Sequence, residues 1–578
     1  MGKRNVEDIK RESRHLRGTI AETLKSDVDH FQEDEYQLLK FHGTYQQDDR
    51  DIRKGKDRKY IFMVRSRIPG GRLTAAQYLM HDRCADDFGG GTIRITSRQG
   101  FQMHHVVKGN LRDYIRKINE SGIATWNACG DVCRNHMATP IPLDTPAHRD
   151  VQQLSGDLVR ALGARSRAYA EIWLNGERLN SVPTDDGPEE EPVYGDTYLP
   201  RKFKIGAAVP PRNDVDIFTN DIGLAPHVAG DVVEGYTLWT GGGFGMTHGK
   251  SETYPVLAQP FAHVRRADLI NVIRAIVTTQ RDFGDRENRR RARLKYTIET
   301  MGFDRFREEV QSRVPDVTLE PPRNVEWNSV GDMIGWHEQG DGKLFVCIYV
   351  PDGRIADWKG GPQQRSAFRA IAERIGCPIR NTPNTNILFH DVEPAQRAEI
   401  DAILKEFKVE IGDHLTDARQ TSQACVALPT CGLALAESER VFQELMDQID
   451  TILRELGMEH EPLLVRMTGC PNGCARPYNA DIAFVGRSPG KYALYIGGSH
   501  RGDRLAVLYL KTVAMEEIPD RMRALLTEFR GGRAGAESFT DWWGRTHTDG
   551  EQPHPSQFHE ELQERAERLA AEKSPTPE

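Results

Sequence analysis

The sequence predicts an α/β (α+β) protein made of two related halves around a pseudo-twofold axis. The first observation is a repeated block in which five positions match without gaps at one constant offset, 379 − 93 = 286 and 392 − 106 = 286. A repeat of this length indicates duplication of a half-chain, not a short solenoid period. The matching positions are Ile93, Arg94, Thr96, His104 and Val106, against Ile379, Arg380, Thr382, His390 and Val392.

The second observation is that the similarity continues in the same order. In each copy a short Asn-containing segment precedes a strand-like, glycine-ended run and then a helical run. The segments are Asn213–Ile217, Tyr236–Gly245 and Arg266–Thr279 in the first copy, and Asn479–Ala483, Lys491–Gly498 and Glu516–Phe529 in the second. Two blocks in one order favour duplication over chance, and ligands favour the interface between such units.

Single elements can be read within the first copy. Residues 1 to about 50 are charged and predict a helix-rich arm. A strand is expected over Lys59–Arg67, a helix over Leu73–Phe88, and a second strand over Thr92–Val106. A short helix is expected near His559–Glu572 in the polar tail.

Composition narrows the class of protein. A chain of 578 residues with 38% hydrophobic and 28% charged residues is expected to fold into two to four globular domains. The net charge of −8 argues against a general nucleic-acid binder. No apolar run is long enough to cross a membrane, and the N-terminus lacks the apolar core of a signal peptide. We therefore expect a cytoplasmic protein whose nine cysteines stay reduced.

Four cysteines predict a metal centre. Cys425 and Cys431 are six positions apart, and Cys470 and Cys474 are four apart in a Gly/Pro/Asn-rich stretch that cannot continue a helix. Four thiolates from two segments match a 4Fe–4S cluster, which takes one cysteine per iron. Two alternatives stay open. One is a zinc site, although paired zinc ligands are usually separated by two to four residues; the other is buried thiols with no ligand role.

Basic residues cluster in the first copy. Strand alternation over residues 94–102 would place Arg94, Thr96, Arg98 and Gln102 on one face. For any single segment, a solvated strand face with local salt bridges is an adequate explanation. Four such segments together indicate a polyanionic ligand, because buried cations need anionic partners. They contain Arg65 and Arg67, Arg94 and Arg98, Arg134, and Arg201, Lys202 and Lys204.

A further basic run and a glycine triplet are less informative. Arg286–Lys295 is expected to be the solvated face of a helix, because most charge runs are. Gly241, Gly242 and Gly243 would let the backbone approach a flat or anionic group, but they do not form a dinucleotide-binding pattern.

These residues resemble the nitrite and sulfite reductases that carry siroheme and a 4Fe–4S cluster, and within that family the hemoproteins of assimilatory sulfite reductases. The resemblance runs from Leu16 to about residue 545. It rests on several motifs that are specific only in combination. They are L-R-G-T-I-A-E (Leu16–Glu22), K-F-H-G-T-Y-Q-Q-D-D-R-D (Lys40–Asp51), A-Y-A-E-I-W-L (Ala168–Leu174), Y-L-P-R-K-F-K (Tyr198–Lys204), T-T-Q-R-D (Thr278–Asp282) and T-G-C-P-N-G-C (Thr468–Cys474).

The resemblance implies a role for each motif residue. The cluster ligands would be Cys425, Cys431, Cys470 and Cys474, with the Cys474 thiolate also bridging to the siroheme iron. The substrate anion would meet Arg65, Arg134, Lys202 and Lys204. The macrocycle and its carboxylates would lie against Arg94, Thr96, Arg98, Gln102 and Asn472. Fixed positive charge suits a site that must hold both an acidic macrocycle and an anion.

The resemblance also implies a domain order, with ferredoxin-like half-domains and two repeats that bind the siroheme and the cluster. The expected divisions are a charged arm (1–55), a first ferredoxin-like half-domain (56–145), a first catalytic repeat on the siroheme and substrate side (146–325), a second ferredoxin-like half-domain (326–412), a second catalytic repeat holding the cluster (413–548), and a polar tail (549–578).

The expected activity is the six-electron reduction of sulfite to sulfide in sulfur assimilation and cysteine biosynthesis. The chain has no convincing nucleotide-binding fingerprint, so electrons would come from a partner, either an NADPH-dependent flavoprotein subunit or a ferredoxin. Two alternatives remain at this stage. One is a nitrite reductase of the same family; the other is a non-catalytic metal-binding interaction protein that kept the duplicated fold.

Overall fold

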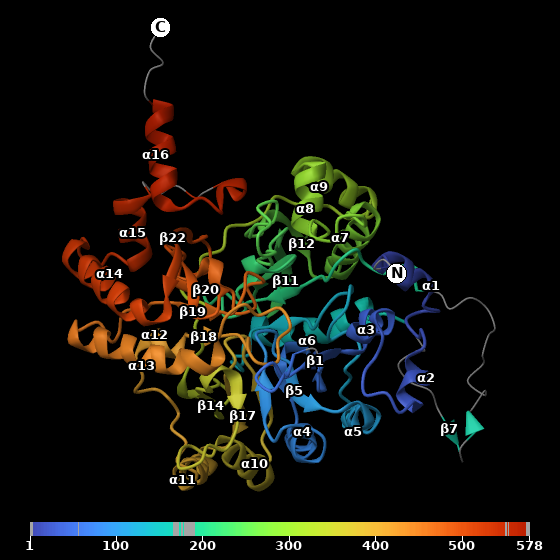
Figure 1. Cartoon of the computed structure of the whole chain (residues 1–578). Helices are drawn as coiled ribbons and strands as arrows, with labels where there is room; N and C mark the ends of the chain where they lie inside the picture. The colour runs from blue at the N-terminus through green and yellow to red at the C-terminus, as the bar shows by residue number, and fades with distance from the viewer. Residues whose placement is uncertain are drawn as a thin grey trace.

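The computed structural model describes residues 4–55, 57–165, 173–174, 177–178, 191–548, 552 and 554–573. Most of the motif at residues 168–174 and part of the C-terminal tail therefore lie outside the described residues. No helix in the described part of the chain is both long and apolar enough to span a membrane. Figure 1 shows the first copy in blue to green and the second in yellow to red, side by side.

Two five-stranded sheets form the ferredoxin-like part of the molecule, and each borrows its last strand from the other half. The first has the order β1-β2-β5-β4-β15 and the second β13-β14-β17-β16-β3. The strands are β1 (Thr44–Asp48), β2 (Tyr60–Arg65), β3 (Arg72–Leu73), β4 (Ile93–Ile95), β5 (Phe101–Val106), β13 (Gly335–Glu338), β14 (Leu344–Ile348), β15 (Arg354–Ile355), β16 (Ile379–Asn381) and β17 (Ile387–Val392). The exchange of β3 and β15 ties the two halves into one core.

Four helices cover these two sheets. One hydrophobic cluster contains buried residues of both halves, among them Phe62 and Ile93 with Phe368 and Ile379. The helices are α4 (Ala75–Asp87), α5 (Leu111–Glu120), α10 (Gln364–Arg374) and α11 (Arg397–Glu406), at the lower edge of Figure 1.

Two further sheets carry the predicted site, and they have the same topology. Each begins with two parallel pairings and continues with two antiparallel ones, in the orders β6-β9-β10-β11-β12 and β18-β19-β20-β21-β22. The strands are β6 (Met137–Ala138), β9 (Ile205–Ala207), β10 (Ile222–Ala229), β11 (Val232–Thr240), β12 (Gln259–Arg265), β18 (Gln423–Ala424), β19 (Val465–Thr468), β20 (Ile482–Ser488), β21 (Lys491–Ile496) and β22 (Val507–Ala514).

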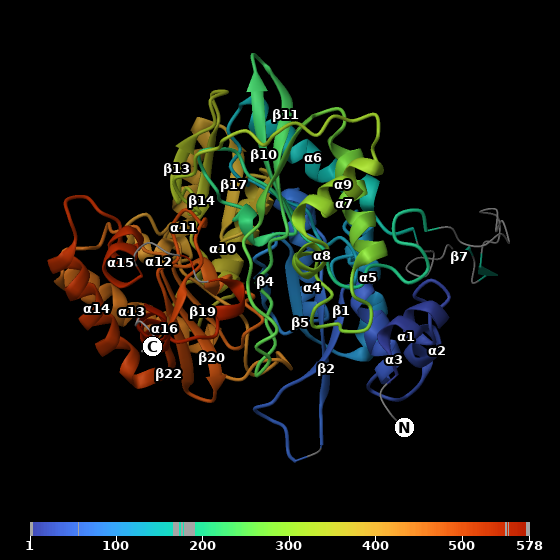
Figure 2. The same ribbon diagram turned by 90° about the horizontal axis from the view of Figure 1, so that it is seen from above.

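Separate groups of helices accompany the two sheets, as the two views in Figures 1 and 2 show. Residues of α6 and α7 share one core cluster with β10 and β11, and residues of α13, α14 and α15 share another with β19, β20 and β21. The helices are α6 (Pro146–Leu162), α7 (Leu269–Phe283), α8 (Leu294–Met301), α9 (Phe303–Ser312), α12 (Asp417–Gln420), α13 (Glu439–Glu455), α14 (Ile518–Gly532), α15 (Phe539–His547) and α16 (Leu562–Lys573).

The backbone supports the predicted duplication. Gln99 and Thr385, which are 286 positions apart, both have positive φ (58° and 70°). His105 and Asp391 have the same separation, with φ of 63° and 57°. Positive φ is uncommon for residues other than glycine, so shared unusual conformations at one offset are specific to related folds.

The two Asn-containing segments that open the second pair of blocks are not at equivalent positions in the structure. Asn213 and Asn479 are 266 positions apart. The structure instead starts β10 at Ile222 and β20 at Ile482, so the offset is 482 − 222 = 260. Asp216 and Arg476, also 260 apart, have φ of 57° and 55° before matching 3₁₀ turns. The asparagines at different positions in the two turns misled the sequence comparison.

Two other elements differ from the prediction. The single strand expected over Thr92–Val106 is a hairpin of β4 and β5, because residues 96–100 turn the chain and Gln99 has positive φ. The run Arg286–Lys295 is not a helix until α8 begins at Leu294. Several of its cations are held by carboxylates of distant segments, so the expected solvated helix face is also wrong.

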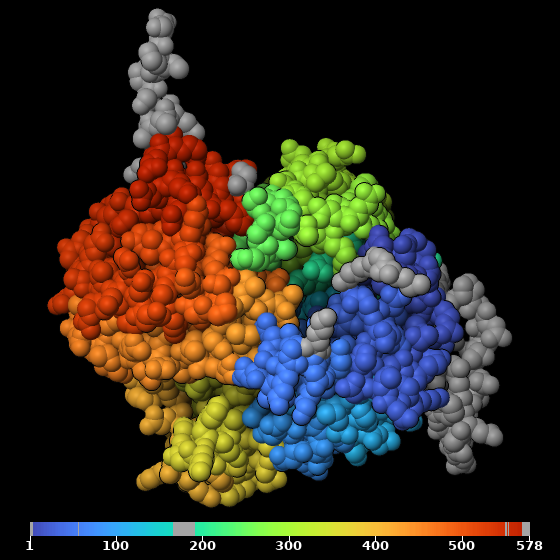
Figure 3. Space-filling model, viewed as in Figure 1, coloured from blue at the N-terminus to red at the C-terminus, as the bar shows by residue number. Residues whose placement is uncertain are grey.

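The N-terminal arm folds into α1 (Val6–Glu12), α2 (Ile20–Lys25) and α3 (Glu33–Leu39), in agreement with the helix-rich prediction. It is attached by buried charges. Lys10 donates to the carbonyl of Leu199 (3.0 Å), and Glu7 accepts from Arg286 (2.5 Å). Figure 3 shows the arm, in dark blue, packed on the first copy. A separate pair, β7 (Trp173–Leu174) and β8 (Glu177–Arg178), forms a two-stranded sheet.

Candidate active site

The four predicted cluster cysteines follow two adjacent strands. Cys425 comes directly after β18 and Cys470 shortly after β19, and these strands are parallel, with Ala424 opposite Met467. The carboxyl ends of parallel neighbours meet at one edge of a sheet, so the two cysteine segments lie together. The amide of Gly469 accordingly donates to Cys425 Sγ at 3.3 Å.

The four thiols lie close enough for their charges to interact. Burial raises the pKa of Cys425, Cys431 and Cys470, the last to about 12, and a negative charge on Cys474 raises each of them further. Thiolates gathered in this way repel one another, so the deprotonated state needs a cation to hold it.

Their spacing suits a multi-iron cluster better than a single ion. Within the described part of the chain, no three His, Cys, Asp or Glu side chains lie near enough to share one metal ion. A zinc site would need its thiolates within about 2.3 Å of one centre. A four-iron cluster places each thiolate on a different iron, so its ligands are further apart. The residues present therefore fit the cluster, and the zinc alternative loses support.

The loop that contains Cys431 is fastened by the first copy. Arg50, in the β1–β2 connection, donates to the carbonyl of Cys431 (2.7 Å) and to that of Ala434 (3.1 Å). Its amide also donates to the carbonyl of Pro429 at 3.3 Å. A segment more than 370 positions earlier in the chain thus holds the cysteine loop.

Cys474 is the exposed member of the four, and it faces the first copy. Ser97, in the β4–β5 turn, donates to the Cys474 carbonyl at 3.1 Å. The Cys474 thiolate lies close enough to Arg65 and Lys202 to favour their charged forms. The predicted bridging thiolate and two predicted anion-binding cations therefore share one space.

Strand pairing places a row of polar side chains on one face of the first ferredoxin-like sheet. Arg65 on β2 lies opposite Gln102 on β5, which lies opposite Arg94 on β4, which lies opposite Arg354 on β15. Directly opposed residues of adjacent strands point to the same side of a sheet. Arg94 and Gln102 thus share a face as predicted, although across a hairpin and not along one strand.

Two of the predicted macrocycle-binding residues, Arg94 and Arg98, already have partners within the protein. Arg94 pairs with Glu439 (3.1 Å) and donates to the Ala424 carbonyl (2.9 Å), so its charge is largely used to join the two copies. Arg98 donates to Asn220 Oδ1 (2.8 Å) and to the Asn135 carbonyl (2.6 Å). These contacts orient both arginines, and their predicted roles beside a macrocycle stay predictions.

The three remaining residues of that group lie at the edges of the same space. Thr96 Oγ1 accepts from the amide of Gly100 (3.1 Å) and shapes the turn. Gln102 is buried, and its Oε1 has no hydrogen-bond partner among the described residues. Asn472 donates from Nδ2 to Cys470 Sγ at 3.6 Å. An unsatisfied buried amide oxygen suits a position that a further group would complete.

Lys202 and Lys204 provide the strongest indication of an anionic ligand. Phe203 between them is 1% exposed, whereas both lysines are half-buried, which is the alternation of an extended chain. Neither ammonium group forms a hydrogen bond or an ion pair with another side chain of the described residues, although Cys474 and Asp221 lie near enough to favour the charged forms of Lys202 and Lys204. Burial lowers the pKa of Lys202 to about 7, aided by Arg201, Arg293 and Arg134, and burial also lowers the pKa of Lys204 well below its usual value. A bound anion would relieve this repulsion.

Arg134 lies in the same group but is more firmly held. It is 9% exposed, and its Nε donates to the Gly130 carbonyl at 2.7 Å. Its amide donates to the carbonyl of Phe203 at 2.8 Å, which places it beside the two lysines. The structure thus brings Arg134, Lys202 and Lys204 together, with Arg65 linked to them through Cys474.

Sequence reasoning missed a supporting group behind these lysines. Asp221 Oδ2 accepts from the Lys204 amide (2.8 Å) and from Arg293 (2.8 Å), all within the protein interior. Lys295 donates to the carbonyl of Gly243 (3.0 Å), which fixes the glycine-rich loop. The basic run at 286–295 was the available signal, but it was interpreted as solvated.

The glycine-rich loop approaches the second cysteine pair, as its composition allowed. The amide of Met246 donates to the Pro471 carbonyl at 3.1 Å. Gly473 has a φ of 65°, and a Cβ there would contact Phe244 at 3.4 Å.

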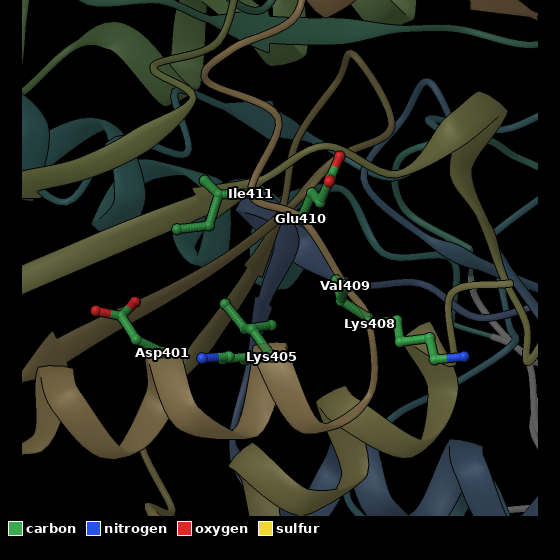
Figure 4. A pocket seen from close by; sticks show the side chains of 7 residues that line it. Asp401, Lys405, Lys408, Val409, Glu410 and Ile411 are labelled. Atoms are coloured by element: carbon green, nitrogen blue, oxygen red, sulfur yellow. The ribbon is translucent and has the colours of Figure 1, made fainter.

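Outside the site, a cavity of about 380 Å³ lies beside α11, lined by Asp401, Lys405 and Glu410 among others (Figure 4). It shares no residue with the site.

Comparison with known proteins agrees with this arrangement. The family model described as the nitrite/sulfite reductase ferredoxin-like half domain matches residues 53–121 and 337–407. The model described as the nitrite and sulphite reductase 4Fe-4S domain matches residues 158–317. A solved structure, the NirA protein of Mycobacterium tuberculosis, shares the fold with a TM-score of 0.76 over 94% of this chain and 97% of its own, at 24% identity.

Curated relatives extend over nearly the whole chain. The sulfite reductase (NADPH) hemoprotein beta-component of Methylobacterium radiotolerans is 46% identical over 93% of this chain and 87% of its own length. That of Xylella fastidiosa is 42% identical over 97% and 99%. The sulfite reductase (ferredoxin) of Synechococcus elongatus is 43% identical over 94% and 89%. The chain belongs to the nitrite and sulfite reductase family.

Proposed function

We propose that this chain is the hemoprotein of an assimilatory sulfite reductase, which reduces sulfite to sulfide with six electrons. It is an oxidoreductase that uses siroheme and a 4Fe–4S cluster. The observation that carries the proposal is that half-buried lysines, which form no ion pair among the described residues, share one space with the exposed Cys474 thiolate. A structural metal site would not need a group of cations beside it, so the non-catalytic alternative loses its support.

Two groups of residues would hold the proposed cofactors, and a third group, described below, would bind the substrate. Cys425, Cys431, Cys470 and Cys474 would hold the cluster, and Cys474 would also hold the siroheme iron. Arg94, Thr96, Arg98, Gln102 and Asn472 would border the macrocycle. When bound, the two groups supply stored electrons and the iron at which sulfur is reduced.

The remaining task of the protein is to bind an anion and deliver protons. Arg65, Arg134, Lys202 and Lys204 would bind the sulfite oxygens by charge-assisted hydrogen bonds. Each oxygen that leaves as water needs two protons, and a lysine with a pKa near neutrality can release and regain one readily. The lowered pKa of Lys202, about 7, fits that use.

The electron donor is a protein partner of one of two kinds. Similar relatives are named for NADPH and for ferredoxin, at 46% and 43% identity, so similarity does not separate the two. We propose that the chain works in the cytoplasm, where such donors and reduced thiols are available. Turnover measured with a purified flavoprotein reductase and, separately, with ferredoxin identifies the donor.

The decisive functional test compares two substrates. Purified protein loaded with both cofactors is assayed with a reduced dye and either sulfite or nitrite. The proposal predicts sulfide formation with the higher kcat/KM for sulfite. Turnover of nitrite far above sulfite would make the chain a nitrite reductase, and no turnover of either would contradict the proposal.

A further inference from the structure

One short turn, residues 128–130, contacts two of the predicted anion-binding arginines. Cys129 is wholly buried, and its Sγ lies 3.1 Å from Arg65 Nη1, which donates to it. The carbonyls of the residues on either side of Cys129 accept hydrogen bonds from Arg134. The Gly130 carbonyl accepts from Nε (2.7 Å) and the Ala128 carbonyl from Nη1 (3.4 Å). A single turn therefore orients both guanidinium groups.

Arg65 has few other anchors. Its Nε is buried without a partner, and within the described chain its side chain makes no hydrogen bond besides the one to Cys129. The ring of Tyr45 lies beside it, with a centroid distance of 6.0 Å. The remaining nitrogen, Arg65 Nη2, forms no hydrogen bond within the described chain and is therefore available to a ligand. Loss of the thiol would therefore leave the guanidinium without a fixed direction.

The turn packs closely against the N-terminal arm. Gly130 has a φ of 93°, and a Cβ at this position would lie 2.7 Å from the ring of Phe41 in the arm. The Asn127 amide donates to the Phe41 carbonyl at 3.0 Å. These contacts with the arm fix the backbone of the turn, so Cys129 has a defined position relative to Arg65.

The chemistry of the contact explains why a thiol suits this place. A carboxylate would fix Arg65 more strongly, but it would neutralise the guanidinium and compete with an incoming anion. A thiol is a weak, uncharged acceptor. It can set the direction of the guanidinium and leave its positive charge available.

We propose that Cys129 is a positioning residue that aims the Arg65 guanidinium at the substrate anion. The inference rests on the proposed function, because it takes Arg65 as an anion binder. It adds a role for a buried thiol to which the proposed function assigns none.

The test compares Cys129→Ala, which removes the acceptor, with Cys129→Ser, which retains one. Cys84→Ala, in α4, is the matched control for loss of a buried thiol elsewhere. The KM for sulfite is measured with a reduced dye. The Kd for inorganic phosphate, an oxyanion that the enzyme cannot reduce, is measured by calorimetry on the oxidised, cofactor-loaded protein.

Cys129→Ala should raise both constants about fivefold, the effect of losing one modest hydrogen bond to a charged group, and change kcat less. Cys129→Ser and Cys84→Ala should stay within about twofold of the wild type. Unchanged constants in Cys129→Ala, equal defects in Ala and Ser, or loss of siroheme from both would overturn the inference. A loaded wild type that reduces no sulfite would instead contradict the proposed function.

Discussion

In each copy, the backbone amide just before an inner strand donates to a buried aspartate, but the side chain of the donating residue differs between the copies. The amide of Lys204 donates to Asp221 Oδ2 at 2.8 Å, and the amide of Leu464, 260 positions later, donates to Asp481 Oδ2 at 2.9 Å. One position thus carries a cation in the first copy and a buried apolar side chain in the second. Duplication preserved the support and left the side chains free to diverge.

The partners of the two carboxylates differ in the same sense. Asp221 is paired with the guanidinium of Arg293, whereas Asp481 accepts from the hydroxyl of Thr540. The carboxylate of the first copy is thus balanced by a guanidinium beside the lysines, whereas that of the second copy accepts a hydrogen bond from a hydroxyl. The comparison supports our proposal that the first copy binds the anion and the second supplies the thiolates.

The largest effect is expected from breaking the thiolate side. Cys474→Ser should remove or uncouple the cluster and lower sulfite turnover by roughly three orders of magnitude or more, because electrons lose their direct path to the iron. Absorbance spectra and iron content give the readout. Cys377→Ser, at a buried thiol of the second copy outside the cysteine loops, is the control. An unaltered heme spectrum in Cys474→Ser would contradict the bridge.

The next effect comes from making the first copy resemble the second. Lys204→Leu should keep both cofactors and lower kcat/KM for sulfite by about a hundredfold, because one charge facing the anion is lost. Arg134→Ala should act similarly. Lys343→Ala, at an exposed lysine 3.9 Å from Glu393, should change nothing measurable. If Lys204→Leu loses its siroheme, Lys204 belongs to the cofactor site and not to the substrate site.

A third comparison concerns stability. Arg293→Ala leaves Asp221 buried without its cation, so the free energy of unfolding should fall by about 3–5 kcal/mol. Thr540→Val, at the equivalent support in the second copy, removes a neutral donor and should cost about 1–3 kcal/mol. Denaturant titrations of the two variants measure both values. A smaller loss in Arg293→Ala than in Thr540→Val would contradict the assignment of charge balance to the first copy.

A smaller effect than that of Arg293→Ala is expected on the pH dependence of stability. Burial raises the pKa of Asp214 to about 7, and its Oδ1 is buried without a partner. The folded state therefore binds this proton more tightly than the unfolded state does, so the contribution is present below about pH 4 and is lost as the pH rises to 7. Replacing Asp214 by Asn should remove a slope worth about 2–4 kcal/mol across that window.

Asp332 offers the contrast for this measurement. Its pKa is also raised by burial, but Asn384, Asn386 and Thr382 all donate to it and oppose the rise. Asp332→Asn should therefore flatten the pH dependence less than Asp214→Asn. Unfolding followed by circular dichroism from pH 4 to pH 8 compares the two. An equal slope in wild type and Asp214→Asn would contradict the assignment.

Much of the fold could be predicted because equivalent strands of the two copies retain similar sequences. The offset of 286 residues between Ile93 and Ile379 follows equivalent strands, β4 and β16. The segments that begin at Asn213 and Asn479 look alike but are not equivalent, because residue identity is a weaker constraint there than backbone conformation at Asp216 and Arg476. Positive φ cannot be read from an aspartate and an arginine.

The site could be predicted where a motif carries its own chemistry. The cysteines were recognisable from their spacing, and Y-L-P-R-K-F-K from its basic residues and from the family resemblance. The partners of Arg94 and the pairing of Arg293 with Asp221 were not, because these contacts join segments 345 and 72 residues apart. A charged run looks solvated until the fold supplies its buried carboxylates.

Anomalous diffraction at the iron absorption edge, from crystals of the cofactor-loaded protein, tests the central claim most directly. We expect one compact group of iron atoms bounded by the four cysteines of the second copy. A further iron should lie on the far side of Cys474, toward Lys202 and Lys204. A single metal ion among the thiols, or an iron peak away from the first-copy lysines, would contradict the division of labour between the copies.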